Sequence, residues 1–416
     1  MIRFLLILGL ALTCYPATVH AQPVEPSSIR VEVDHVPVEF DVSPIIEAGR
    51  TLAPFRAIAE ALGVVVTWEA ASQTVHATSG AVTIRLPIGQ RTAYRLDQPI
   101  ALDVPAQIRE GRTLVPLRFF AEAFGAKVEW LAADRLVRIQ SPPRPMTVIG
   151  FYALGSSEAS SWTDLFGVPY PDHTHGKTEH VTDLALGWYS LDAQGRLLTD
   201  SVYGWRRPDG WEDVLAVAQQ YGLRTQMTIH ATDADGRLTQ LLADEAAQAR
   251  AVEGILEHVD QYDGVNLDLE GLGLTQQGDA LEAVRDSFTA FVRKLAERLP
   301  QNKTLTLTLH APNSQYRGYD YAALATLADR IIVMAYNYGP VPEPLDRVIE
   351  AVRLALDAVP ADKLVLGISL PHETETSLPA KIGLAKRYGL QGIALWRLGL
   401  VPDNFWATIG QMINAR

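Results

Sequence analysis

Residues 263–270 read Asp-Gly-Val-Asn-Leu-Asp-Leu-Glu, with apolar and polar side chains alternating from Val265 onward. This period of two is typical of a β-strand, in which every second side chain lies on the same face. Asn266, Asp268 and Glu270 therefore share one face. Unpaired carboxylates are costly to bury, so acids repeated along one face of a strand indicate chemistry. The alternative is that they form only internal salt bridges.

This strand is the fourth of eight apolar runs in the second part of the chain. The runs are 147–154, 181–188, 224–230, 264–269, 304–309, 330–335, 363–370 and 392–396. Between them, apolar residues recur every three or four positions, as in amphipathic helices, at 211–221, 240–259, 280–299, 345–359 and 378–388. This alternation predicts an α/β fold, a (β/α)8 TIM barrel. A doubly wound sheet is the alternative, but no glycine-rich phosphate loop follows the first run.

The active site of such a barrel is built where its strands end, at the C-terminal face. Glu270 closes the fourth run and is the candidate proton donor. A proton donor at neutral pH needs a raised pKa, which burial and a neighbouring negative charge can provide. Asp268, two residues below on the same face, is expected to supply that charge.

The same segment resembles the D-x-x-D-x-D-x-E signature of glycoside hydrolase family 18. Three further segments support the resemblance, and they read Gly150-Phe151-Tyr152, Met334-Ala335-Tyr336 and Ala394-Leu395-Trp396. Within that family, the barrel is most similar to the spore-cortex and peptidoglycan N-acetylglucosaminidase branch. The resemblance implies a retaining, substrate-assisted hydrolysis, in which the 2-acetamido group of the sugar attacks its own anomeric carbon.

By this resemblance Glu270 protonates the leaving oxygen and then deprotonates water, while Asp268 and Tyr336 orient the acetamido group. Trp396 forms the floor under the reacting sugar. The other substrate-binding candidates are Tyr152, Asp263, Asn266, His310 and Asn337. Asn266 and Asn337 stand where most members of the family have Asp, which removes two acids from the site. No cofactor and no metal ion are expected.

The first part of the chain contains an internal duplication. Gly49–Trp68 reads GRTLAPFRAIAEALGVVVTW and Gly111–Trp130 reads GRTLVPLRFFAEAFGAKVEW, with twelve of twenty positions identical. Each copy has a Gly-Arg-Thr turn, a short amphipathic helix and a strand, which predicts a small α+β module made twice. The repeat resembles the copper amine oxidase N-terminal-like stalk domain. Its two histidines, His35 and His76, leave a copper site almost without ligands.

Four large residues of the repeats are expected to pack and hydrogen-bond within their own copies, as buried aromatic residues usually do. They are Arg56, Trp68, Arg118 and Trp130. The alternative role for the stalk is that of a spacer or a contact with the cell wall. A proline-rich linker, 141–145, follows, so the expected domains are the stalk over 22–142 and the barrel over 146–416.

Residues 1–21 resemble a secretory signal peptide, with a charged start, an apolar run over 4–12 and small residues before Gln22. The apolar run is too short to cross a bilayer, so no integral membrane segment is expected after cleavage. The single cysteine, Cys14, lies within the leader, and a lipoprotein signal is the lesser alternative. The net charge of −12 argues against nucleic acid as a partner.

These features together predict a secreted glycosidase, extracellular or associated with the cell wall or spore, that cleaves β-1,4 linkages next to N-acetylglucosamine in peptidoglycan. A chitinase is the nearest alternative. The short segment 371–390 disfavours it, because it leaves no room for the insertion that deepens many chitinase grooves. A lectin-like wall protein with little or no turnover is the second alternative.

Overall fold

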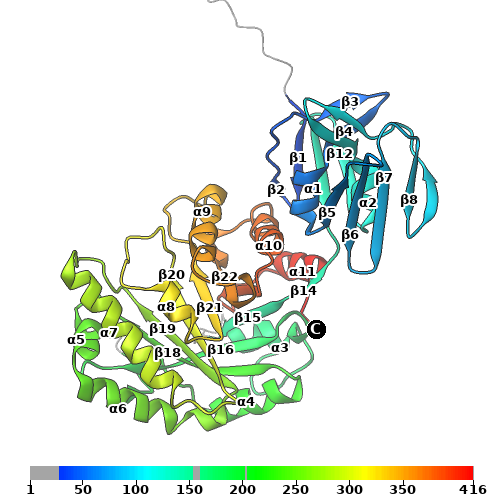
Figure 1. The fold of residues 1–416 in the computed structure, drawn as a ribbon. Coiled ribbons are helices and arrows are strands. Elements are labelled where there is room, and N and C mark those ends of the chain that lie inside the picture. Colours follow the sequence, from blue (N-terminus) through cyan, green and yellow to red (C-terminus); the bar gives the residue numbers. More distant parts are fainter. Residues whose placement is uncertain (1–27, 153–159, 202–203, 416) are drawn as a thin grey trace, which may run out of the picture.

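The computed structural model describes residues 28–152, 160–201 and 204–415 and shows two domains (Figure 1). The expected leader over 1–21 lies outside these residues. The larger domain is a closed parallel barrel, in the order β15-β23-β22-β21-β20-β19-β18-β16, with β16 returning to β15. The predicted TIM barrel is confirmed. Its strands are β15 (Thr147–Tyr152), β16 (Asp183–Leu191), β18 (Arg224–Thr232), β19 (Gly264–Glu270), β20 (Thr304–His310), β21 (Arg330–Met334), β22 (Leu364–Ser369) and β23 (Gly392–Trp396).

Helices surround the barrel on its outside (Figure 1). They are α3 (Ser161–Phe166), α4 (Trp211–Gln220), α5 (Arg237–Ala243), α6 (Glu245–Leu256), α7 (Asp279–Ala296), α8 (Tyr321–Ala325), α9 (Leu345–Leu356), α10 (Leu378–Arg387) and α11 (Asp403–Met412). The helix expected over 240–259 is in fact two. Asp244 separates them because its carboxylate accepts the amide proton of Ala246 at 2.8 Å and so starts a new helix.

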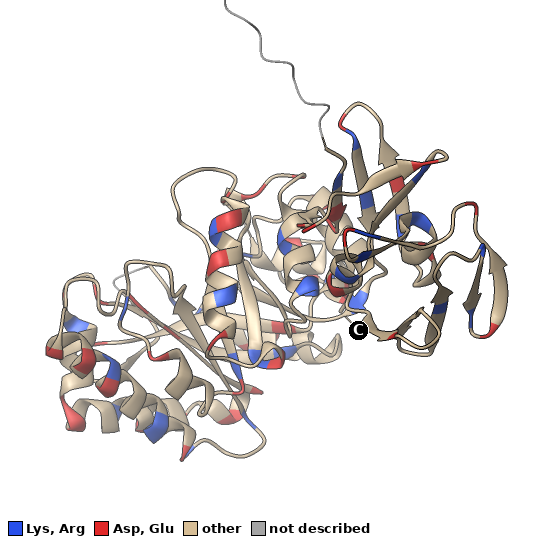
Figure 2. Ribbon diagram, turned by 45° about the horizontal axis from the view of Figure 1, so that its top comes forward, with Lys and Arg blue, Asp and Glu red and all other residues tan. Residues whose placement is uncertain are grey.

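Charged side chains of both signs are interspersed over the two domains (Figure 2). In the ranges that the structure covers, no helix has the length and hydropathy needed to cross a membrane.

The smaller domain holds three antiparallel or mixed sheets and two helices, α1 (Phe55–Leu62) and α2 (Leu117–Ala123). Its strands are β1 (Arg30–Val33), β2 (Val36–Pro37), β3 (Ile45–Glu47), β4 (Arg50–Pro54), β5 (Val65–Glu69), β6 (Thr74–Ser79), β7 (Val82–Pro87), β8 (Thr92–Arg95), β9 (Gln98–Ala101), β10 (Gln107–Arg109), β11 (Arg112–Pro116), β12 (Lys127–Leu131) and β13 (Leu136–Gln140). The duplication predicted from the sequence appears as the units β3-β4-α1-β5 and β10-β11-α2-β12.

The two copies are related by a local two-fold axis. Strands β4 and β11 pair antiparallel with Ala53 opposite Val115, and these residues occupy equivalent positions in the two repeats. Each repeat also turns at a glycine in the left-handed region, Gly49 with φ 73° and Gly111 with φ 72°. These glycines close tight hairpins, a turn that needs positive φ.

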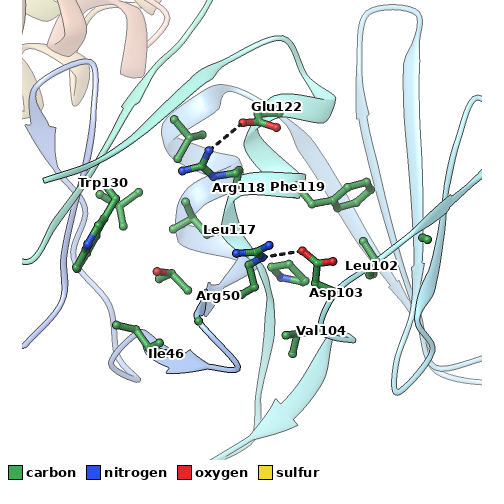
Figure 3. Close-up of a pocket in the computed structure, with 16 residues that line it drawn as sticks. Ile46, Arg50, Leu102, Asp103, Val104, Leu117, Arg118, Phe119, Glu122 and Trp130 are labelled. Carbon is green, nitrogen blue, oxygen red and sulfur yellow. Dashed lines mark hydrogen bonds and ion pairs between the residues drawn. The ribbon is translucent and has the colours of Figure 1, made fainter. Parts of the chain in front are cut away.

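The structure corrects the expectation for the large residues of the repeats. Trp68 is 40% exposed and Trp130 is 37% exposed, and Arg56 and Arg118 are exposed as well. Trp130 borders a hollow on the domain surface instead of filling the core (Figure 3). The core of the domain is made by smaller side chains, including Ile58, Val75, Ile84 and Phe120.

A buried contact joins the two domains. The ammonium group of Lys386 on α10 lies 3.1 Å from the carboxylate of Asp34, and both side chains are at most 3% exposed. Asp34 also accepts the amide proton of Ser141 at 2.9 Å. Arg387 donates to the carbonyls of Val36 and Pro37. The proline-rich segment is therefore part of a packed joint.

Side chains of the barrel strands alternate between two surroundings. Those pointing outward, such as Val265, Leu267 and Leu269 of β19, pack against the helices in the main core. Those pointing inward form a small apolar cluster on one side of the barrel, with Ile149, Phe151, Ala185, Ile332, Val365 and Ala394. On β18, β19 and β20 the inward positions carry polar residues, including Thr228, Asn266 and Thr306, all of them buried.

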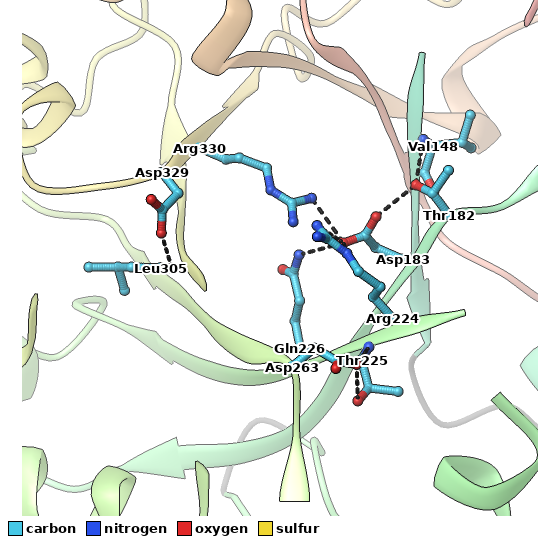
Figure 4. A network of polar contacts seen from close by, with 10 residues as sticks. All are labelled: Val148, Thr182, Asp183, Arg224, Thr225, Gln226, Asp263, Leu305, Asp329 and Arg330. Atoms are coloured by element: carbon cyan, nitrogen blue, oxygen red, sulfur yellow. Dashed lines mark hydrogen bonds and ion pairs between the residues drawn. The ribbon is translucent and has the colours of Figure 1, made fainter. Parts of the chain in front are cut away.

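A buried ion pair closes the N-terminal end of the barrel (Figure 4). Arg330 of β21 donates to the carboxylate of Asp183 on β16 at 2.9 Å, and both residues are 2% exposed. Arg224 and Gln226 of β18 donate to the same oxygen of Asp183 at 2.9 and 3.3 Å. One carboxylate thus links three strands across the barrel interior.

We expect Asp183→Asn to lower the stability of the barrel strongly, because it leaves the buried guanidinium of Arg330 without a compensating charge. Breaking a buried pair in this way costs about 3–5 kcal/mol. Asp134→Asn is the matched control, since its pair with Arg30 is 61% exposed on both sides and is expected to contribute less than about 1 kcal/mol. Urea denaturation of both variants tests this; equal losses would contradict the role given to Asp183.

Candidate active site

Glu270 is held between two histidines at the C-terminal end of the barrel. Its Oε1 lies 3.4 Å from Nε2 of His230, and its Oε2 lies 3.4 Å from Nε2 of His310. His230 belongs to β18, and His310 is the last residue of β20, so the strands on both sides of β19 position the carboxylate. The Glu270 side chain is 28% exposed, against 7% for His230 and 14% for His310.

Asp268 lies one step deeper on the same face of β19 and is 2% exposed. Among the described residues, its Oδ1 and Nδ2 of Asn266 have no hydrogen-bond partner. Oδ1 of Asn266 accepts from the hydroxyl of Thr308 at 2.9 Å. The side-chain NH2 of Asn266 is therefore an unused donor two residues before the buried carboxyl of Asp268. A carboxylate can accept a hydrogen bond from such a group.

Asp268 and Glu270 titrate as a pair, and their pKa values move in opposite directions. Burial and the charge of Glu270 raise the pKa of Asp268 well above its ordinary value. Burial also disfavours the Glu270 carboxylate, but the hydrogen bond from His230 and the charges that His310 and His230 carry when protonated outweigh burial and lower its pKa. Burial in turn lowers the pKa of His310, so its charge acts only towards acidic pH. The expected raised pKa thus belongs to Asp268 instead of Glu270, because the histidines stabilise the outer carboxylate. As the pH falls, Asp268 therefore takes up a proton before Glu270 does, and the two acids can share that one proton.

Tyr336 follows β21 and is half-buried, with its hydroxyl near the two acids. Burial, with the negative charges of Glu270 and Asp268, raises its pKa well above the ordinary value. Its hydroxyl therefore keeps its proton at any working pH and can donate a hydrogen bond. Tyr319, which is buried, donates from its hydroxyl to the carbonyl of Leu269 at 2.8 Å and so supports the end of β19.

Aromatic rings form one wall of the mouth. Trp396, the last residue of β23, lies 5.5 Å from the ring of Phe151 and 5.4 Å from the ring of Trp205, measured between centroids. Trp205 also stacks on His230 at 4.3 Å with an interplanar angle of 18°. Glycine at position 187 makes this possible, because a Cβ there would overlap the Trp205 ring.

Trp205 and Tyr316 were not predicted from the sequence. Tyr316 stacks on His310 at 3.9 Å, as Trp205 does on His230, so each histidine beside Glu270 has an aromatic ring against it. Both rings come from loops, where no periodic pattern marks a position as facing the site. The only sequence signal is an aromatic residue in a loop after a barrel strand.

The structure brings most of the predicted site residues together. Asp268, Glu270, His310 and Tyr336 surround one point at the mouth, Asn266 lies below them, and Trp396 borders them.

Three predicted residues do not meet that point. Tyr152 faces outward, with its ring 6.2 Å from that of Trp188, because Phe151 takes the inward position. Asp263 precedes β19 at the opposite end of the barrel, where its carboxylate accepts the amide proton of Thr225 at 2.7 Å. Asn337 forms a turn with φ 66°, and its backbone N–H donates to the carboxylate of Glu343 at 2.6 Å.

One set of side chains in the described ranges has the spacing of metal ligands. His230, Asp268 and Glu270 each offer a ligand atom, and these atoms lie within 4.8 Å of one another. The same spacing also suits the sharing of a proton between carboxylates.

Two family models match the chain. Residues 170–371 match Glycosyl hydrolases family 18, and residues 32–139 match Copper amine oxidase N-terminal domain. The first match contains both acids of the site and Tyr336. The second contains both copies of the repeat. The family resemblances drawn from the sequence are confirmed.

Two curated proteins match parts of the chain in sequence. The chain is 29% identical over 145 residues, 32% of each protein, to YdhD of Bacillus subtilis (strain 168), which is named a sporulation-specific glycosylase. It is 24% identical over 168 residues, 37% of each protein, to the cortical fragment-lytic enzyme of Bacillus anthracis. The matched segments thus span about a third of these two relatives.

The crystal structure of a chitinase from Chromobacterium violaceum has the same fold as the barrel. It superposes with a TM-score of 0.52 at 20% identity, over 64% of this chain and 98% of the chitinase chain.

We expect Asp268→Asn to change how stability depends on pH. Asp268 has a raised folded-state pKa, so the folded protein keeps a proton that the unfolded chain releases above its pKa of about 3.9. The wild type therefore loses stability as pH rises from about 4 to the folded pKa, by up to about 1.4 kcal/mol per pH unit. The Asn variant lacks this loss, and its melting temperature should gain on that of the wild type across the window.

Glu270→Gln provides the internal check on this measurement. It removes the charge that helps to raise the pKa of Asp268, so its pH slope should fall between those of the wild type and Asp268→Asn. A difference in melting temperature that stays constant from about pH 4 to about pH 8 would rule out the shared proton.

Proposed function

We propose that this chain, whose residues 170–371 match Glycosyl hydrolases family 18, is an exported glycosidase that cuts peptidoglycan by substrate-assisted catalysis. The cleaved bond is the β-1,4 linkage next to N-acetylglucosamine. The observation that carries the proposal is the arrangement of Glu270 at the barrel mouth, above the buried Asp268 and beside the protonated hydroxyl of Tyr336.

In the first step the acetamido oxygen of the sugar attacks C1, and the bond from C1 to the glycosidic oxygen breaks. The leaving oxygen takes its proton from Glu270. The shared proton must first pass from Asp268 to Glu270 when the substrate binds, and this transfer leaves Asp268 ionised. Asp268 then faces the positive charge that forms on the acetamido group and stabilises it, while Tyr336 donates a hydrogen bond to the same group.

In the second step water attacks C1 and opens the oxazolinium intermediate. Glu270, now a carboxylate, accepts the proton of that water, and the retained configuration follows from two displacements at one carbon. The histidines on either side of Glu270 favour its ionised form, which helps this step. The aromatic wall of Phe151, Trp205 and Trp396 supports the apolar face of the bound sugar.

Peptidoglycan is proposed over chitin for two reasons. The curated relatives YdhD and the cortical fragment-lytic enzyme carry names from sporulation and spore cortex. In addition, the described chain passes from β22 through the short turn Leu370–His372 to α10 and then β23, without an inserted domain beside the mouth. An open cleft accommodates a peptide-substituted strand more readily than a deep one. The leader-like residues 1–21 support export to the wall.

Glu270→Gln should lower hydrolysis by about 100- to 10,000-fold, the contribution typical of a general acid and base. Binding of oligosaccharide should persist, because Gln keeps the shape of the side chain. Release of reducing ends, together with calorimetric titration of the same variant, measures both effects. Equal activity in variant and wild type would refute the assignment, and full binding by an inactive wild type would favour the lectin-like alternative.

Substrate class and mechanism can be tested in one series. Purified peptidoglycan or cortex fragments should be cut faster than insoluble chitin, and mass spectrometry of the products should show N-acetylglucosamine at the new reducing end. A thiazoline that mimics the oxazolinium intermediate should bind much more tightly than substrate. Faster turnover of chitin identifies a chitinase, and weak thiazoline binding removes the acetamido group from the mechanism.

A further inference from the structure

The duplicated domain contains two hollows that are equivalent under its local two-fold axis. One has a volume of about 700 Å³ and the other about 590 Å³. The first combines the turn Gly49–Thr51 of one repeat with Trp130 and the start of α2 from the other. The second combines Gly111–Thr113 with Trp68 and the start of α1. Each hollow is therefore built by both copies together.

Paired charges line both hollows. In the first, Arg50 lies 2.7 Å from Asp103, and Arg118 lies 3.9 Å from Glu122 (Figure 3). In the second, Arg112 pairs with Asp41 in the position equivalent to Arg50 and Asp103. Arg56 also lines the second hollow, where Glu39, Asp41 and Glu60 outnumber the two arginines, and the first hollow has two arginines and two acids. Neither hollow therefore offers net positive charge to a polyanion. This balance suits a ligand without net charge.

An exposed indole stands at the edge of each hollow. Trp68 is 40% exposed and Trp130 is 37% exposed, and in Figure 3 Trp130 stands across the hollow from Phe119 with the ion pairs between them. Tryptophan offers a flat apolar face, while guanidinium and carboxylate groups supply directional hydrogen bonds. A pyranose ring has matching chemistry, with an apolar C–H face and polar groups around its rim.

We propose that the two hollows bind N-acetylhexosamine glycan strands, which makes the stalk a bivalent glycan-binding module. The indole stacks on a sugar ring, and the paired arginine and acid side chains receive hydroxyl and acetamido groups. The choice of this glycan rests on the proposed function, because the barrel on the same chain then acts on the same polymer. Uncharged sugars also fit a protein with a net charge of −12 better than nucleic acid does.

Two equivalent sites on one rigid domain hold a polymer more strongly than one. Once the first hollow is occupied, the second meets the same or a neighbouring strand at high effective concentration. Such coupling can strengthen binding by about 10²–10⁴-fold. Loss of one indole should therefore weaken retention on an insoluble polymer more than it weakens binding of a short oligosaccharide.

The test uses the full chain carrying Glu270→Gln, so that the polymer stays intact, and measures co-sedimentation with insoluble peptidoglycan, chitin and cellulose. Trp68→Ala and Trp130→Ala should each weaken binding to peptidoglycan and chitin by about a hundredfold or more, because either change removes the two-site coupling, and the double variant should bind more weakly still. Cellulose, which lacks acetamido groups, should bind weakly throughout. Tryptophan to phenylalanine changes at both positions should restore most of the binding.

Leu96→Ala is the matched control, because Leu96 is an exposed apolar residue of the same domain, 50% exposed, and borders neither hollow. Melting temperatures check that all variants fold. Unchanged sedimentation of the double tryptophan variant overturns the proposal, and so does an equal loss on cellulose. Hydrolysis of soluble oligosaccharides by the tryptophan variants with Glu270 restored should match the wild type, so failure of the barrel's activity and failure of the stalk's binding are read separately.

Discussion

A buried carboxyl without a cation is the constraint on which the rest of the site depends. Asp268 lies in the barrel interior next to Glu270, and the two cannot both ionise at low cost because like charges in a low-dielectric interior repel. A proton must therefore remain in the pair. The protein holds it on the inner acid by placing His230 and His310 against the outer one. The site is thus prepared as a carboxylate at the mouth over a carboxylic acid below.

The interior of the barrel has an apolar side and a polar side, and the two acids belong to the polar side. Apolar side chains fill the side made by β15, β16 and β21–β23, while β18–β20 bring polar groups inward. The ion pair of Asp183 and Arg330 occupies the opposite end of the interior. Both acids therefore lie between this ion pair and the mouth, which the aromatic wall around Trp396 borders.

The features of local periodicity were readable from the sequence, and those of long-range packing were not. The eight strands and the inward position of Glu270 follow from the spacing of apolar residues, which recur every second position in strands and every three to four positions in helices. Backbone geometry enforces both periods. The orientation of Tyr152 was missed because one position along a strand reverses a side chain, and the motif alone did not set the phase. Trp205 lies in a loop and stacks on His230 of β18, a contact that no local pattern of the sequence marks. The exposure of Trp68 and Trp130 depends on how two repeats pair, which neither repeat encodes alone.

The joint between the domains has a consequence for how the protein can be divided. Asp34 neutralises Lys386, and Val36 packs into the core of the barrel. Cutting the chain at the proline-rich segment to remove the stalk would leave the ammonium group of Lys386 without its carboxylate partner. It would also expose the apolar surface that Val36 covers. The barrel therefore depends on the stalk to cover part of its surface. A chimaera that exchanges either domain must keep the residues that form this interface.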